Sequence, residues 1–114
     1  MPRSEKIVNA EQFAALALSF PGTEQVPHFD RIGFKITGRR MFTTYLERDH
    51  TCNVFLSVNE QKDFCSLDMK NIYPVPNKWG EKGVTTFVLK NLSIEIVAEA
   101  LKTAYDATRL KRKG

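Results

Sequence analysis

The strongest constraint on the fold is an apolar stripe at helical spacing between residues 94 and 108. Ser93, just before the stripe, is a typical N-cap residue. Acidic residues near the start and basic residues near the end suit the helix dipole. The stripe consists of Ile94, Val97, Ala98, Leu101, Ala104, Tyr105 and Thr108. Because a helix with one apolar face buries that face against another layer, we expect this helix to pack on the rest of the domain.

The middle of the chain has a different period, in which apolar and polar residues alternate as they do in half-buried strands. Phe34 and Ile36 form one such run, and Phe42 and Leu46 form the next. Residues 37–40 lie between the two runs and contain a glycine, which indicates a hairpin turn.

A third run covers residues 52–58 and places alternate apolar side chains on one face. These side chains are Cys52, Val54, Leu56 and Val58. Residues 84–89 are rich in β-branched and aromatic side chains, which predicts another strand. Three successive strands with short connections favour an antiparallel meander.

Two more helices are predicted from their capping residues. The first has Asn9 as N-cap with Gln12 three residues later, and it ends at Pro21-Gly22. Its expected core face is Phe13, Leu16 and Ala17. The second is expected to follow an Asn59 N-cap and to end before Pro74 and Pro76. Its expected core contacts are Phe64, Leu67 and Ile72.

These elements predict a single α+β domain spanning residues 1–114, with helices packed on a largely antiparallel sheet. The expected order is helix, three or four strands, helix, one or two strands, helix, and then a short basic tail at 109–114. No apolar run approaches the roughly 18 residues of a membrane helix, and the first residues lack the apolar core of a signal peptide. We therefore expect a cytoplasmic protein without a membrane partner.

Residue types that carry catalysis or bind metals are few and scattered. Cys52 and Cys65 are thirteen positions apart and form no C-x-x-C pair, so two free thiols are expected. His28 is expected to be a hydrogen-bonded loop residue near Asp30, and His50 a turn residue. A zinc site at His50-x-Cys52 is the less favoured alternative. With no nucleophile elbow and no phosphate loop, we expect neither an enzyme nor a cofactor, metal site or small-molecule substrate.

The net charge of +4 is concentrated near one end of the chain. The last six residues include four basic ones, Arg109, Lys111, Arg112 and Lys113. Without these four, 13 basic residues remain against 13 acidic ones, so the body of the protein is neutral. Such a tail either attracts nucleic acid or an acidic partner, or is a solvated helix end.

A basic cluster also occupies the predicted hairpin. Between residues 31 and 46 the chain carries Arg31, Lys35, Arg39 and Arg40 and no acidic residue. A basic hairpin can follow a phosphate backbone or enter a groove. The alternative, which these residues alone favour, is an exposed strand edge that carries charge against aggregation.

The segment Lys78-Trp79-Gly80-Glu81-Lys82-Gly83 places the chain's one tryptophan in a basic loop bracketed by glycines. An exposed Trp79 can stack on a nucleobase, with Lys78 and Lys82 beside it. The alternative, which we favour at this point, is that Trp79 packs over the edge of the core and holds the loop down.

These stretches together resemble the MmcQ/YjbR family of small bacterial proteins, over residues 9 to 110. The matching motifs are Phe20-Pro21-Gly22-Thr23-Glu24, Pro27-His28-Phe29, Gly33-Phe34-Lys35-Ile36, Arg40-Met41-Phe42-Thr43-Thr44, Ile72 to Gly80 with Gly83, and Ala100-Leu101 with Ala104-Tyr105. The resemblance implies a three-helix, mixed-sheet α+β fold, similar in topology to secretion chaperones. It also implies DNA binding through a double-wing arrangement, without a catalytic residue or cofactor. Relatives often have a second Trp after the last glycine, where this chain has Val84.

Two functions therefore compete. The first is a non-catalytic DNA-binding protein that contacts nucleic acid through Arg31, Lys35, Arg39, Arg40, Lys78, Trp79 and Lys82. The second is a protein- or peptide-binding module, which the neutral body favours. A basic stripe that joins the two loops would support the first, and a contiguous apolar patch on the sheet would support the second.

Overall fold

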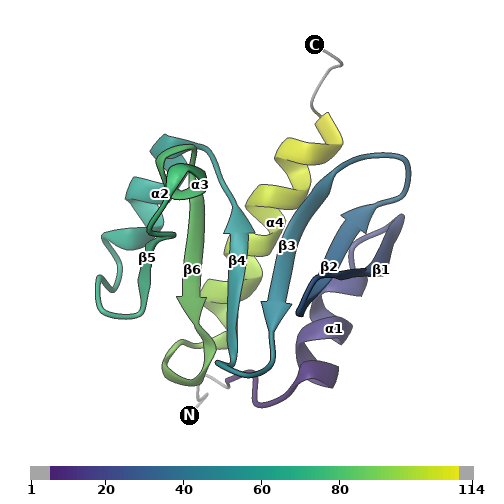
Figure 1. Ribbon diagram of the computed structural model, residues 1–114, viewed down its shortest axis with the longest axis horizontal. Coiled ribbons are helices and arrows are strands. Elements are labelled where there is room, and N and C mark those ends of the chain that lie inside the picture. Colours follow the sequence, from purple (N-terminus) through teal and green to yellow (C-terminus); the bar gives the residue numbers. More distant parts are fainter. Residues whose placement is uncertain (1–5, 111–114) are drawn as a thin grey trace.

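A computed structural model describes residues 6–110 as one antiparallel sheet with helices packed on one of its faces (Figure 1). The expected α+β class is therefore confirmed. The basic side chains predicted for the tail at 111–113 lie outside the described residues, and Arg109 lies inside them. Within residues 6–110 no helix combines the length and apolar character that a membrane crossing requires.

The helices are α1 (Ala10–Leu18), α2 (Val58–Cys65), the short α3 (Lys78–Glu81) and α4 (Ile94–Leu110), with a 3-10 turn at Leu89–Asn91. The strands are β1 (Thr23–His28), β2 (Arg31–Ile36), β3 (Met41–Leu46), β4 (Thr51–Phe55), β5 (Ile72–Pro74) and β6 (Val84–Val88). In the described part of the chain the strand order is β1-β2-β3-β4-β6-β5, and all neighbours are antiparallel. The last strand in the sequence, β6, is thus inserted between β4 and β5.

The core lies between the sheet and α1, α2 and α4. Phe13 of α1 is fully buried, and its ring centroid lies 5.5 Å from that of Phe34 and 5.1 Å from that of Tyr45. On α4, the Tyr105 ring lies 5.8 Å from the Phe42 ring. Aromatic rings from α1 and α4 therefore cover one face of the sheet.

The predicted caps of the first and last helices are confirmed. The Asn9 side chain accepts a hydrogen bond from the Gln12 N–H at 2.9 Å, and Ser93 Oγ accepts one from the Ile96 N–H at 3.4 Å. The Gln12 side chain bonds the Val8 N–H and not that of Asn9, so the capping box is incomplete. The stripe of α4 is buried at Val97, Ala100, Leu101, Ala104, Tyr105 and Thr108.

The predicted start of α2 is wrong. Ser57, not Asn59, is its N-cap, because Ser57 and Glu60 form a reciprocal capping box with hydrogen bonds of 3.1 and 2.8 Å. Strand β4 consequently ends at Phe55, and Val58 is 42% exposed instead of facing the core.

The predicted end of α2 is also wrong. The helix stops at Cys65, so Leu67 lies in the following turn and is 60% exposed. Ile72 is buried as expected, but it belongs to β5, which pairs with β6.

Candidate functional site

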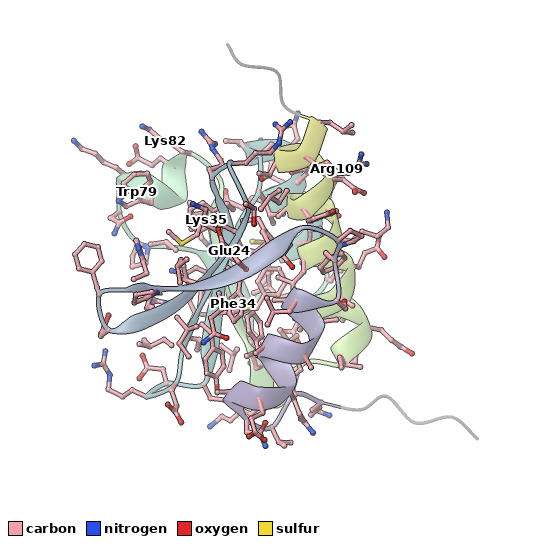
Figure 2. The ribbon with its side chains drawn as sticks, turned by 90° about the vertical axis from the view of Figure 1, so that its right-hand side faces the viewer. Glu24, Phe34, Lys35, Trp79, Lys82 and Arg109 are labelled. Carbon is pink, nitrogen blue, oxygen red and sulfur yellow. The ribbon has the colours of Figure 1, made fainter. Side chains whose placement is uncertain are left out.

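One face of the sheet carries no helix from α1, α2 or α4. Because strand side chains alternate between faces, the residues between the core positions point away from these helices. In Figure 1, α4 runs behind β3 and β4, so the uncovered face is toward the viewer. Figure 2 shows this face at the left, where Trp79 and Lys82 lie, and α4 at the right.

The uncovered face contains a cleft of about 420 Å³. Its lining comes from the β1–β2 hairpin, the middle strands and the segment that contains α3. The lining residues are His28, Phe29, Arg31, Met41, Thr44, Asn53, Phe55, Val75, Asn77, Trp79 and Val84. This volume lies within the range of about 300–1,000 Å³ that is usual for ligand pockets.

The β1–β2 turn forms one part of the cleft lining. Its first residue, Phe29, is 94% exposed and has a φ of 60°. His28 is the last residue of β1 and not a loop residue as expected, and its ring lies 4.9 Å from that of Phe29. Asp30 instead pairs with Arg48 at 3.5 Å.

The segment around α3 forms another part of the cleft lining. Asn77 caps α3 by accepting a hydrogen bond from the Trp79 N–H at 2.8 Å. The buried Gln61 side chain donates to the carbonyls of Gly80 and Val84 at 2.9 and 3.1 Å. These bonds tie the segment to α2 and β6 through its backbone.

The expectation that Trp79 packs over the edge of the core is wrong. Its side chain is 60% exposed, and Lys82 Nζ lies 5.7 Å from the ring centroid. The loop is held instead by close backbone contact, because a Cβ at Gly80 would collide with the Val75 carbonyl. The tryptophan ring is therefore available to a ligand.

The cleft is positive. Arg31 lines it and its Nη1 lies 3.4 Å from Thr44 Oγ1, which fixes the guanidinium against the sheet. None of the lining residues is acidic. Such a lining suits an electronegative ligand better than a cationic one.

A second cleft of about 280 Å³ adjoins the first and shares Phe55 with it. Arg40 and Lys82 line it together, although they come from the β2–β3 turn and the loop after α3. Glu60 is also present, but one of its carboxylate oxygens accepts the Ser57 N–H of the capping box at 2.8 Å. The two basic loops predicted from the sequence are thus neighbours.

The remaining predicted residues differ in their surroundings. Arg39 Nη1 donates to the Thr108 carbonyl near the end of α4 at 3.5 Å, which suits the helix dipole. Lys35 lies opposite Glu24 in the β1–β2 pair, so an acid offsets part of its charge. Figure 2 shows Lys35 and Glu24 close together near the middle of the view. Lys78 is an exposed residue of α3.

The histidine and cysteine side chains outside the cleft have structural roles. His50 is a turn residue, as expected, and its ring bridges the Tyr45 hydroxyl at 2.9 Å and the Ile7 carbonyl at 2.6 Å. Cys52 and Cys65 are free thiols, and burial raises the pKa of both. Within residues 6–110, no three His, Cys, Asp or Glu side chains are grouped to hold a metal ion.

The residues that the sequence did not assign to a site include Phe29, Asn53 and Asn77 of the cleft and Gln61, which supports it. Asn77 had a detectable signal, because an Asn directly before Lys78-Trp79 is a typical N-cap. Phe29 and Asn53 had none, because only the register of β1, β2 and β4 brings them to the same face.

Comparisons with known proteins bear on the fold alone. No family model and no curated protein matches this sequence. Among solved structures, the chain is similar to the crystal structure of the Deinococcus radiodurans protein DR2400, which belongs to the domain family DUF419. The TM-score is 0.67 at 12% identity, over 85% of this chain and 75% of that one. The chain therefore has the α+β fold of a small bacterial domain from a family of unknown function.

Proposed function

We propose that this chain is a non-catalytic, cytoplasmic DNA-binding domain of the MmcQ/YjbR type. In this proposal the nucleic acid meets the uncovered face of the sheet and the second cleft, which residues of α4 also line. Arg31, Arg40, Lys78 and Lys82 contact phosphates, and Trp79 contacts a base. Lys35 and Arg39 contribute less, because one faces an acid and the other bonds the end of α4.

The observation that carries the proposal is the meeting of the two basic loops. Arg40 and Lys82 line one cleft, and Phe55 joins this cleft to the acid-free cleft that contains Arg31. Cations from separated parts of the chain therefore line two clefts that have Phe55 in common. A phosphate backbone needs such a row of positive charges far more than a protein partner does.

The proposal is tested by measuring binding to random-sequence DNA over a range of salt concentrations. Four phosphate contacts predict a slope of log affinity against log salt of about −3.6 for duplex and about −2.8 for single strands. The variant R40A/K82A removes two contacts, so its duplex slope should fall to about −1.8. Fluorescence anisotropy of labelled DNA supplies both quantities.

A charge-matched control is K70A/K90A, which also removes two exposed basic residues. Lys70 lies just before β5 and Lys90 just after β6, and both are outside the two clefts. The control should retain the slope of the unchanged protein. Absence of DNA binding at low salt would refute the proposal, and equal slopes for the two double variants would refute the role of the second cleft.

One observation favours peptide binding as the second candidate. Most of the cleft lining is apolar or aromatic, including Met41, Phe55, Val75 and Val84. An apolar peptide would bind there without a salt-dependent slope. Titration of hydrophobic peptides, followed by Trp79 fluorescence with and without competing DNA, separates the two candidates.

A further inference from the structure

Two large aromatic side chains in the first cleft add little to the core. Phe29 is 94% exposed and Trp79 is 60% exposed, yet both line the same cleft from different elements. Neither belongs to the hydrophobic core cluster. Burial in the fold therefore does not account for the presence of either ring.

The backbone at Phe29 gives an independent observation. Phe29 and Asp30 form a two-residue turn between the paired residues His28 and Arg31, and Phe29 has a positive φ. Glycine is strongly preferred at such a position, because a bulky side chain is strained there. A phenylalanine that is both strained and exposed points to use by a ligand.

The polar residues of the cleft supply hydrogen-bond donors. The Asn53 side-chain oxygen already accepts the Thr86 hydroxyl at 2.8 Å, and the Asn77 oxygen accepts the Trp79 N–H at 2.8 Å. Their amide nitrogens bond to no other described residue. Together with the Arg31 guanidinium, they form a donor-rich lining without a carboxylate.

Such a lining matches a flat, acceptor-rich ring attached to a phosphate. A nucleobase has two aromatic faces for stacking, and the carbonyl oxygens of its edge accept hydrogen bonds. In a duplex the faces of a base are covered by its neighbours, so only an unpaired base can enter a cleft between aromatic side chains.

We propose that the cleft binds an unpaired base of single-stranded nucleic acid, which stacks on Phe29 and Trp79. This inference rests on the proposed function, since the same basic residues would hold the phosphates on either side. It adds that the preferred form of nucleic acid is single-stranded. The donor-rich lining favours bases whose edge is rich in carbonyls, such as thymine.

The only tryptophan of the chain lies in the cleft, so its fluorescence reports on occupancy directly. The probes are oligothymidylate, the same strand paired with oligoadenylate, and an abasic strand of equal length. Oligothymidylate should quench Trp79, whereas the abasic strand has phosphates but no base and should not. Equal affinity and equal quenching for all three probes would overturn the inference.

The variant F29G separates binding from folding. Glycine relieves the positive φ, so the melting temperature should stay equal or rise. Loss of one stacking partner should weaken oligothymidylate binding by about 5- to 150-fold, from the usual range for one stacked base. The control L67A truncates another exposed apolar residue outside the cleft and should leave affinity unchanged. Unchanged affinity in F29G would overturn the role of Phe29.

The outcomes also distinguish this inference from the proposed function. If duplex and abasic strands bind as well as oligothymidylate and with the expected salt slope, the proposed function stands and the base site falls. If no probe binds at low salt, the proposed function and the base site are both refuted. If an apolar peptide quenches Trp79 and DNA does not displace it, the cleft is a peptide site and the base site falls.

Discussion

The two faces of the sheet use aromatic residues in opposite ways. On the helix-covered face, the Phe13 ring centroid lies 5.5 Å from that of Phe34 and 5.1 Å from that of Tyr45, and all three residues are almost fully buried. On the uncovered face, Phe29 and Trp79 are mostly exposed and line a cleft. The same residue types thus stabilise the fold on one side and offer contact surface on the other.

The difference teaches that stability and binding are separable in this protein. Removing a ring from the covered face leaves a cavity, whereas removing one from the uncovered face leaves solvent. Support for the cleft comes from the hydrogen bonds that the Gln61 side chain donates and from close packing at Gly80. The following predictions test how complete the separation is.

The largest effect is expected for a matched pair of phenylalanine variants. F13A should lower the free energy of unfolding by about 3–5 kcal/mol, because its fully buried ring leaves a cavity. F29A should change it by no more than about 0.5 kcal/mol, because the ring is already in water. Urea unfolding of both variants measures the contrast. Similar losses in the two would break the distinction between the faces.

An intermediate effect is expected for Q61L. This substitution removes the donor to the Gly80 and Val84 carbonyls and should cost about 1–3 kcal/mol. Because the α3 segment then loses its anchor, the emission spectrum of Trp79 should also change. The control W79F should unfold at nearly the same urea concentration as the unchanged protein. A Q61L protein of normal stability would contradict the anchoring role of the Gln61 side chain.

The smallest effect concerns the two thiols. Burial raises the pKa of Cys52 in the folded state, so the fold favours its neutral form. This contribution to stability is present below the unfolded thiol pKa of about 8.5 and declines as the pH rises above it. Melting temperatures should therefore fall less between pH 7 and pH 10 in C52V than in the unchanged protein. An equal fall in melting temperature in C52V and in the unchanged protein would contradict a raised pKa for Cys52 in the folded state.

Iodoacetamide provides a second measurement of the same contrast. Cys65 is partly exposed and should be alkylated before the fully buried Cys52 in the folded protein. In urea the two should react at similar rates. Preferential labelling of Cys52 without denaturant would show that the covered face opens.

Much of the fold is visible in the sequence where a local signal decides the structure. The Asn9 and Ser93 caps and the stripe of α4 are of this kind. The start of α2 was misplaced because alternation of apolar residues continues to Val58, while the capping box of Ser57 and Glu60 begins the helix earlier.

The candidate site is visible only in part. Arg40 and Lys82 were predicted from charge, but their common cleft depends on β6 being inserted between β4 and β5. Asn53 reaches the first cleft through the pairing of β4 with its neighbours, and Phe29 through a tight turn. Such contacts between distant segments have no local sequence signal.

The anchoring of the α3 segment has a consequence for how the protein can change. The Gln61 side chain and the close backbone contacts at Gly80 and Gly83 keep this segment in place, and the indole ring does not. Position 79 can therefore accept other side chains at little cost in folding, so its identity is open to selection for a different ligand. The anchor is required for the local fold, whereas the residue beside it can be exchanged by evolution or by an engineer.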